Sequence, residues 1–292
     1  MITPQQKAHF YDFGFIRLRQ QFSTDEMEAL GREVDEMFAE QRGGGPPGEN
    51  QGMADIIEKS PVATRMLVDD RIFGTVEELL GPRFVWNGSG GSLSYTGVNG
   101  KGEHRWHSDR PAEPHGTTYS FHLYLENLRG DTGALRVIPG SHRPSLYDNL
   151  LPLSEDVHDA AEKVYGLSPT DLPGVVVESD PGDIVFFTQK IYHGVYGMQP
   201  GRRYLKLRFA AWPETDEEIA SFMRYDHRGS IYDPIEPFTS SDNSRIRAMI
   251  DPLAELKART EARREHFDAL GARTTYGELY EAAKAQYKRV YG

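Results

Sequence analysis

Apolar residues recur with helical spacing through most of the first 83 residues. The clearest helix is predicted over 23–41, where one apolar stripe contains Met27, Leu30, Val34 and Phe38. Ser23 and Glu26 have the spacing of a capping box, which marks the start of this helix. Shorter helices are predicted over 3–12 and 71–81, and a half-buried strand over 14–22. These elements indicate a mainly helical N-terminal support.

Between residues 84 and 212 the pattern changes to short apolar or alternating runs, separated by Gly, Pro, Asp and Asn. We predict strands at 83–97, 117–128, 133–142, 174–179, 182–189 and 203–213. Short strands in succession, without helices between them, favour an antiparallel barrel or sandwich. Helical spacing returns after residue 213. The sequence therefore predicts a mostly β core with flanking N-terminal and C-terminal α-helices.

We expect a single domain over residues 1–292, because no linker-like stretch divides the chain. Within it, 1–83 is the N-terminal helical support, 84–213 the core and 214–292 a C-terminal helical extension. In this extension Leu253, Leu256, Phe267 and Leu270 have the spacing of a packing stripe. We favour a stripe that covers the core, and leave closure over the substrate and formation of a dimer open.

Composition excludes several classes of function. The chain has 33 Lys and Arg against 44 Asp and Glu, a net charge of −11, and no basic block, so we expect no nucleic-acid partner. It has no Cys, which excludes disulfides, thiolate nucleophiles and Cys-based metal sites. No signal-peptide pattern or apolar stretch of about 20 residues is present. We therefore expect a cytoplasmic monomer or homodimer with no membrane partner.

Three side chains could hold one metal ion. His107 and Asp109 are two residues apart, so in an extended segment they point to the same side. His193 follows the apolar run 184–187, which is typical of a buried strand, and precedes Gly194. Two His and one carboxylate are the facial triad of non-haem Fe(II) oxygenases, which leaves open positions on the ion. Zinc could use the same ligands, so these residues alone do not identify the metal.

Two arginines downstream suggest a carboxylate ligand. Arg202 and Arg203 open the last predicted strand, and an Arg fork matches the two oxygens of a carboxylate. Together with an iron site, this suggests 2-oxoglutarate as co-substrate. Strand alternation puts Arg202 on one face with Tyr204, Lys206 and Arg208, and Arg203 on the other with Leu205, Leu207 and Phe209. The apolar face should pack against helices, so we favour Arg202 as the inward residue and leave Arg203 open.

Four pieces of the chain match a known family of enzymes: "WHSD" at 106–109, "DTGALRVIPGSHR" at 131–143, "PGDIVFFTQKIYHG" at 181–194 and "RRYLKLRFA" at 202–210. Through these pieces the chain resembles the phytanoyl-CoA dioxygenase family of Fe(II)/2-oxoglutarate-dependent oxygenases. The resemblance covers roughly residues 1–212. It implies a double-stranded β-helix, the jelly-roll or cupin-like barrel.

The resemblance also implies site residues and cofactors. It assigns Fe(II) to His107, Asp109 and His193, and the distal carboxylate of 2-oxoglutarate to Arg202. With O2 as the second co-substrate, such an enzyme would oxidise an unactivated C–H bond of a small molecule and release succinate and CO2. Where the family often carries a Trp before the "GAL" segment, this chain has "SFHLYLENL", so His122 or Tyr124 is expected to line the co-substrate pocket.

The substrate side is less defined by the sequence. Tyr95, Trp106 and Arg110 are the candidates for substrate contact. Hydroxylation, desaturation and ring formation all remain open. Two other classes of protein also stay open, a cupin-like metal-binding or small-molecule-binding protein without oxygenase activity, and a Zn or Mn hydrolase on the same ligands.

Overall fold

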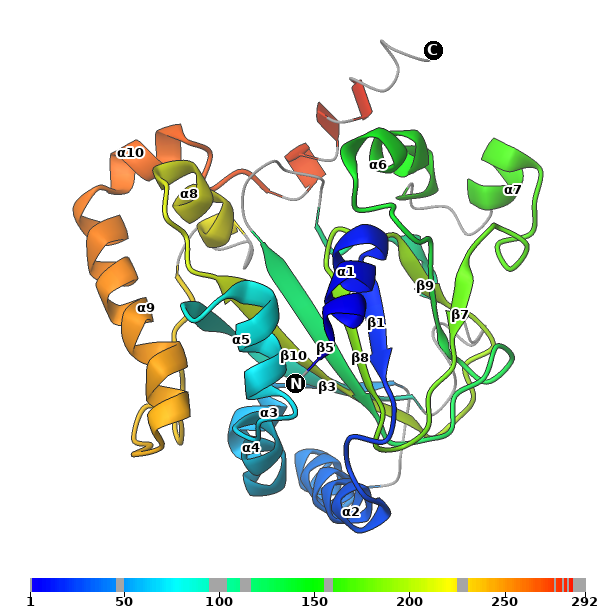
Figure 1. The fold of residues 1–292 in the computed structure, drawn as a ribbon, viewed down its shortest axis with the longest axis horizontal. Helices are drawn as coiled ribbons and strands as arrows, with labels where there is room; N and C mark the ends of the chain where they lie inside the picture. The colour runs from blue at the N-terminus through cyan, green and yellow to red at the C-terminus, as the bar shows by residue number, and fades with distance from the viewer. Residues whose placement is uncertain are drawn as a thin grey trace.

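Two antiparallel sheets form the centre of the molecule (Figure 1). The computed structural model describes residues 2–45, 50–94, 104–110, 117–154, 160–224, 231–275, 277–279, 281–282 and 284–285. In this part of the chain the larger sheet has the order β1 (Phe15–Leu18), β8 (Ile184–Thr188), β5 (Thr118–Tyr124), β10 (Arg202–Ala211), β3 (Phe84–Ser94), β2 (Gln51–Ala54). The smaller sheet has the order β4 (His104–His107), β9 (His193–Val195), β6 (Leu135–Val137), β7 (Val175–Val177). This arrangement confirms the predicted jelly-roll core.

Helices from both ends of the chain cover the outer face of the larger sheet (Figure 1). From the N-terminal part come α1 (Pro4–Phe13), α2 (Thr24–Gln41), α3 (Ile56–Lys59), α4 (Pro61–Leu67) and α5 (Phe73–Leu80). From the C-terminal part come α8 (Asp216–Arg224), α9 (Ser244–Ala262) and α10 (Arg264–Ala269). The flanking helices are therefore confirmed. The part of the predicted C-terminal helical extension beyond residue 275 lies largely outside the described residues.

A third group of helices was not predicted. It connects β6 to β7 and consists of α6 (Pro144–Leu150), the 3-10 helix η2 (Leu151–Ser154) and α7 (Ala160–Tyr165). These helices are only four to seven residues long, too short for a 3.6-residue period to stand out in the sequence. Tyr147 and Leu150 nevertheless pack with Trp106 in a small apolar cluster on the outer side of the smaller sheet.

Alternation along β10 explains how the larger sheet is covered. Leu205, Leu207 and Phe209 are each at most 1% exposed and belong to the main apolar core with the helices. The ring of Phe209 lies 5.2 Å from that of Trp86 on β3, edge-on. The expected C-terminal stripe joins the same core through the buried residues Leu253, Leu256 and Phe267 and the partly buried Leu270. Both sequence predictions, the apolar outer face and the covering stripe, are confirmed.

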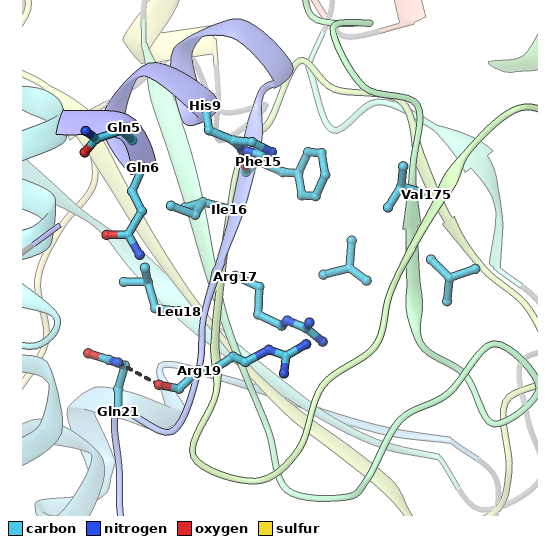
Figure 2. Close-up of a pocket in the computed structure, with 12 residues that line it drawn as sticks. Gln5, Gln6, His9, Phe15, Ile16, Arg17, Leu18, Arg19, Gln21 and Val175 are labelled. Atoms are coloured by element: carbon cyan, nitrogen blue, oxygen red, sulfur yellow. Dashed lines mark hydrogen bonds between the residues drawn. The ribbon is translucent and has the colours of Figure 1, made fainter. Parts of the chain in front are cut away.

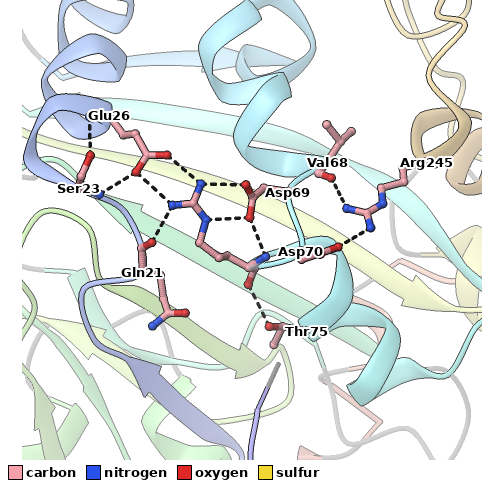
Figure 3. A network of polar contacts seen from close by, with 9 residues as sticks. Gln21, Ser23, Glu26, Val68, Asp69, Asp70, Thr75 and Arg245 are labelled. Atoms are coloured by element: carbon pink, nitrogen blue, oxygen red, sulfur yellow. Dashed lines mark hydrogen bonds and ion pairs between the residues drawn. The ribbon is translucent and has the colours of Figure 1, made fainter.

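A network of ion pairs connects helices of this outer layer to one another (Figure 3). Arg71, which lies between α4 and α5, donates to Glu26 at 2.8 Å and to Asp69 at 2.7 Å. Glu26 also completes the capping box with Ser23 at the start of α2, as predicted. The network therefore ties the start of α2 to the turn before α5.

One side of the jelly roll is open to a groove (Figure 2). The groove has a volume of about 720 Å³ and lies between β1 and β7, which end their respective sheets. Arg17 and Arg19 project into it from β1 and the residue after it, and Val175 lines its other wall. Arg17 donates to the backbone carbonyl of Glu178 across the groove. The side chain of Arg17 thus bridges part of the groove.

Candidate metal centre

His107 and His193 meet because their strands are neighbours. The strand β4 ends at His107 and pairs with β9, which begins at His193, and these two residues are partners in the antiparallel register. Partners in such a register point to the same face of the sheet. Their ring centres are 4.2 Å apart. Asp109, two residues after β4, completes the group.

The three side chains direct their donor atoms to one point. The Nε2 atoms of His107 and His193 lie 3.8 Å and 4.0 Å from Oδ1 of Asp109. All three candidate ligand atoms lie within 4.8 Å of one another, and they form the metal-ligand cluster found in the described part of the chain. The three residues predicted as metal ligands are therefore brought together.

Backbone carbonyls orient both imidazoles. Nδ1 of His107 lies 2.8 Å from the carbonyl oxygen of Arg105, and Nδ1 of His193 lies 3.0 Å from that of Ile191. A carbonyl oxygen only accepts, so each Nδ1 carries the hydrogen. The lone pair is then on Nε2, the atom that faces Asp109.

Burial and the charge of Lys206 set the protonation states of His107 and Asp109. Burial lowers the pKa of His107 to about 4, so its imidazole is neutral at pH 7. Burial alone would raise the pKa of Asp109, but the charge of Lys206 and the nearby imidazoles outweigh it and hold that pKa well below its usual range. The donor set is therefore the neutral imidazole of His107, the imidazole of His193 and one carboxylate, which fits a divalent transition metal.

Lys206 is the residue that the sequence analysis missed at this centre. Its Nζ lies 2.6 Å from Oδ2 of Asp109. Strand alternation had already placed Lys206 on the inner face of β10, and a lysine that points into a barrel was the available signal. Its contact with Asp109 depends on how the two sheets face each other, which the sequence pattern does not encode.

Arg202 lies further along the same inner face. It is four residues from Lys206, roughly 13 Å along an extended strand, and is only 6% exposed. Its Nε donates to the carbonyl of Gly133 at 2.9 Å, and its guanidinium lies 5.1 Å and 5.2 Å from the ring centres of Tyr124 and Tyr204. No carboxylate among the described residues pairs with it. Gly133 has φ +92°, and a Cβ there would meet Arg202 Cδ at 3.0 Å, which explains why glycine occupies this position.

His122 and Tyr124 line the wall between Lys206 and Arg202. They lie on β5, where His122 is the register partner of Lys206 and Tyr124 that of Tyr204. Nδ1 of His122 lies 3.0 Å from the Tyr124 hydroxyl, while Nε2 is buried and has no hydrogen-bond partner within the described chain. Burial, with the charge of Lys206, lowers the pKa of His122 well below its usual value, so the ring is neutral.

Arg203 has a different environment. It points to the outer face of the sheet, where it contacts Glu126 at 2.7 Å and Asp35 at 2.8 Å. Its Nη1 also donates to the carbonyl of Gly31 on α2. The Arg203 guanidinium is therefore bonded to groups of the protein itself, and the structure does not bring it to the metal centre.

Two of the candidates for substrate contact, Trp106 and Arg110, have protein partners of their own. Trp106 lies on the opposite face of β4 from His107, where it is buried and donates to the carbonyl of Pro169. Arg110 is buried and donates to the Thr118 hydroxyl at 3.0 Å and to the carbonyl of Ser221 at 2.8 Å, so it ties β5 to α8. Tyr95 lies outside the described residues. The groove of Figure 2 contains none of the triad residues.

Solved structures with the same fold include proteins with a metal ion, or a metal ion and 2-oxoglutarate, bound. HygX from Streptomyces hygroscopicus, with nickel and 2-oxoglutarate bound, is 16% identical with a TM-score of 0.58 and covers 74% of this chain and 92% of its own. EctD from S. alaskensis with bound Fe is 25% identical with a TM-score of 0.55, at 72% and 77% coverage. SnoK, a non-heme alpha ketoglutarate dependent carbocyclase from nogalamycin biosynthesis, is 17% identical with a TM-score of 0.55, at 72% and 84%.

The sequence itself matches one family. Among curated proteins, none matches the chain closely enough to count as a relative. The family model described as phytanoyl-CoA dioxygenase (PhyH) matches residues 10–197, a span that includes β4, β9 and all three metal-ligand candidates. Among the described residues no helix is long and apolar enough to cross a bilayer. The chain therefore belongs to the phytanoyl-CoA dioxygenase family of Fe(II)/2-oxoglutarate-dependent oxygenases.

Proposed function

We propose that this enzyme oxidises an unactivated C–H bond of a small organic molecule, most simply by hydroxylation, with release of succinate and CO2. His107, Asp109 and His193 would hold Fe(II), and Arg202 would bind the distal carboxylate of 2-oxoglutarate. The observation that carries the proposal is the pairing of a converging donor triad with a buried arginine on the same interior.

The inner wall fits a carboxylate on chemical grounds. The Arg202 guanidinium lies 5.1 Å from the ring centre of Tyr124, and the hydroxyl of that tyrosine can donate to Nδ1 of His122. A neutral His122 then carries its hydrogen on Nε2, the buried atom that has no partner among the described residues. A guanidinium without a carboxylate and a donor without an acceptor both favour an anionic oxygen ligand here.

Each group of the chain then has a definite task. The triad fixes the ion through three ligands and leaves the remaining positions open. Arg202 and His122 orient the co-substrate, and the apolar residues Phe187 and Val185 of the neighbouring strand exclude water from beneath it. The bound iron, with 2-oxoglutarate and O2, supplies the oxidising chemistry.

Anaerobic titration of the metal-free protein tests this proposal. We expect Fe(II) to bind, and subsequent addition of 2-oxoglutarate to produce the visible charge-transfer band of an iron-chelated keto acid. Asp109→Ala should show no band at the same concentrations. Binding of Fe(II) by the wild type without such a band would instead favour a metal-binding protein or a hydrolase.

A second measurement separates oxidation from mere binding. Incubation of the loaded enzyme with 2-oxoglutarate and O2 should yield succinate even without substrate, at a slow rate. The substrate itself can then be sought by the acceleration of this reaction across panels of small molecules. Absence of succinate under all conditions would contradict the proposed reaction.

A further inference from the structure

The two oxygens of Asp109 have separate partners. Oδ1 faces both imidazoles, at 3.8 Å from His107 and 4.0 Å from His193. Oδ2 accepts a hydrogen bond from Nζ of Lys206 at 2.6 Å. One carboxylate thus joins a candidate metal centre on the smaller sheet to a lysine on the larger sheet.

The position of Lys206 on β10 is fixed by the fold. Its register partners are His122 on β5 and Gly90 on β3, so it lies in the middle of the larger sheet and points inward. The side chains of Lys206 and Asp109 are each 21% exposed, which limits screening of their interaction by water. A positive charge is therefore held next to the position of the ion.

We propose that Lys206 is a positioning residue that restricts Asp109 to one metal bond and lowers metal affinity in exchange for stronger binding of the anionic co-substrate. This inference rests on the proposed function, because it assigns Lys206 a role toward Fe(II) and 2-oxoglutarate. No other residue described at the centre carries a positive charge in contact with a ligand of the triad.

Two physical effects support the proposal. A carboxylate with both oxygens available can bind an ion through two bonds and occupy a further coordination position. Lys206 holds Oδ2 and so keeps that position open for the co-substrate or O2. In addition, a fixed cation repels a divalent metal ion and attracts a dianion. Loss of the lysine should therefore shift the two affinities in opposite directions.

The test compares Lys206→Met and Lys206→Arg with the wild type in the full chain. Methionine keeps much of the length and removes the charge, whereas arginine keeps the charge. Anaerobic titration gives the Kd of Fe(II), and the charge-transfer band at saturating iron gives the Kd of 2-oxoglutarate. For Lys206→Met we expect tighter iron binding, by roughly threefold or more, and weaker 2-oxoglutarate binding, by roughly tenfold or more. Lys206→Arg should restore both values toward the wild type.

Lys257 provides a matched control. Lys257 lies on α9, and its Nζ donates to the two carboxylate oxygens of Asp233 at 2.6 Å and 2.9 Å in an exposed ion pair. Lys257→Met removes the same charge and a similar contact far along the chain from the triad. Both affinities should stay within the error of the wild-type values. A change equal to that of Lys206→Met would show that net charge alone is responsible and would overturn the proposal.

The outcomes separate the proposal from the function on which it rests. If the wild type shows the band and Lys206→Met weakens both affinities, or changes neither, Lys206 has no such positioning role. If the wild type binds iron without a band, the proposed function itself fails. Should Lys206→Met not fold, Lys206→Gln is to be measured in its place, with the same opposite shifts expected.

Discussion

The two faces of β10 use the same residue type in opposite ways. Arg203 on the outer face is held by Glu126 and Asp35, within a layer of helices. Arg202, the preceding residue, is buried on the inner face and has no carboxylate among the residues described. Strand alternation separates these neighbours by the thickness of the sheet. Arg203 on the covered face is thus paired within the fold, whereas Arg202 on the inner face has room in its surroundings for a carboxylate from a ligand.

The largest effect should come from removal of a metal ligand on the inner side. His193→Ala deletes one of the three converging donors and leaves the strand pairing of β9 in place. We expect the affinity for Fe(II) to fall at least about 100-fold, because even partners outside the ligand shell change metal affinity by 10- to 100-fold. Anaerobic metal titration measures this.

His266→Ala serves as the control for this change. His266 is exposed on α10 and pairs with Asp216, away from the triad. Iron affinity should stay unchanged in this variant. Retention of wild-type affinity in His193→Ala would remove His193 from the assigned ligand set.

A core substitution on the outer face should affect stability and leave ligand binding intact. Leu207 is 1% exposed and packs in the core between the larger sheet and the helices. Leu207→Ala should lower the free energy of unfolding by about 2–5 kcal/mol, through lost burial and the cavity left behind. Urea denaturation measures the loss.

The conservative change Leu207→Met should cost less than about 1.5 kcal/mol, since volume is kept. The folded fraction of Leu207→Ala should bind 2-oxoglutarate with the wild-type Kd. A specific loss of co-substrate affinity in the folded protein would mean that the two faces of β10 are not independent.

The pair Arg202→Ala and Arg203→Ala sharpens the comparison directly. Arg202→Ala removes charge-assisted bonds to the co-substrate, worth about 1.5–3 kcal/mol, so the Kd of 2-oxoglutarate should rise roughly 10- to 100-fold with iron affinity unchanged. Arg203→Ala should leave that Kd within about threefold. It should instead lower the free energy of unfolding by about 1–3 kcal/mol, because half-buried Glu126 loses its partner. Equal effects of the two variants on co-substrate binding would contradict the assignment.

Local patterns were sufficient for much of the fold. The capping box of Ser23 and Glu26 places the start of the first long helix within one residue of α2. The period of two along 202–211 separates inner from outer residues of β10 correctly, because one face is covered by apolar helices. The jelly-roll class and the family are likewise confirmed. The single-domain organisation, the cytoplasmic location and the oligomeric state stay predictions.

The candidates for substrate contact show where strand alternation applies and where it ends. His107 points inward at the end of β4, so strand alternation turns its neighbour Trp106 away from the centre, and the structure places Trp106 there. Arg110 lies beyond the end of β4, where alternation does not apply, and it donates to Thr118 on β5 and to Ser221 on α8. The contact of Lys206 with Asp109 could not be predicted, because it depends on how the two sheets face each other. The two residues are 97 positions apart in the chain.

The smallest effect concerns the ion pairs of the outer layer (Figure 3). The hydrogen bonds from Arg71 lower the pKa of Glu26 to about 2. A carboxyl group with a lower pKa in the folded state than in the unfolded state stabilises the fold above its unfolded pKa, near 4.5. This stabilisation is lost as pH falls from there toward 2. Since Glu26 is 37% exposed, solvent screening reduces it to less than about 1 kcal/mol.

Arg71→Met should therefore flatten the dependence of stability on pH between 4.5 and 3. Glu26→Gln should flatten it less, because Arg71 also holds the pKa of Asp69 below its usual value through its hydrogen bonds. Urea denaturation at the two pH values measures the difference for each variant against the wild type. If the dependence persists in both variants, the acid sensitivity arises elsewhere in the outer layer. Neither variant should change the affinity for iron or 2-oxoglutarate at pH 7, because the paired charges of the outer layer serve the fold and are separated from the inner face by the sheet itself.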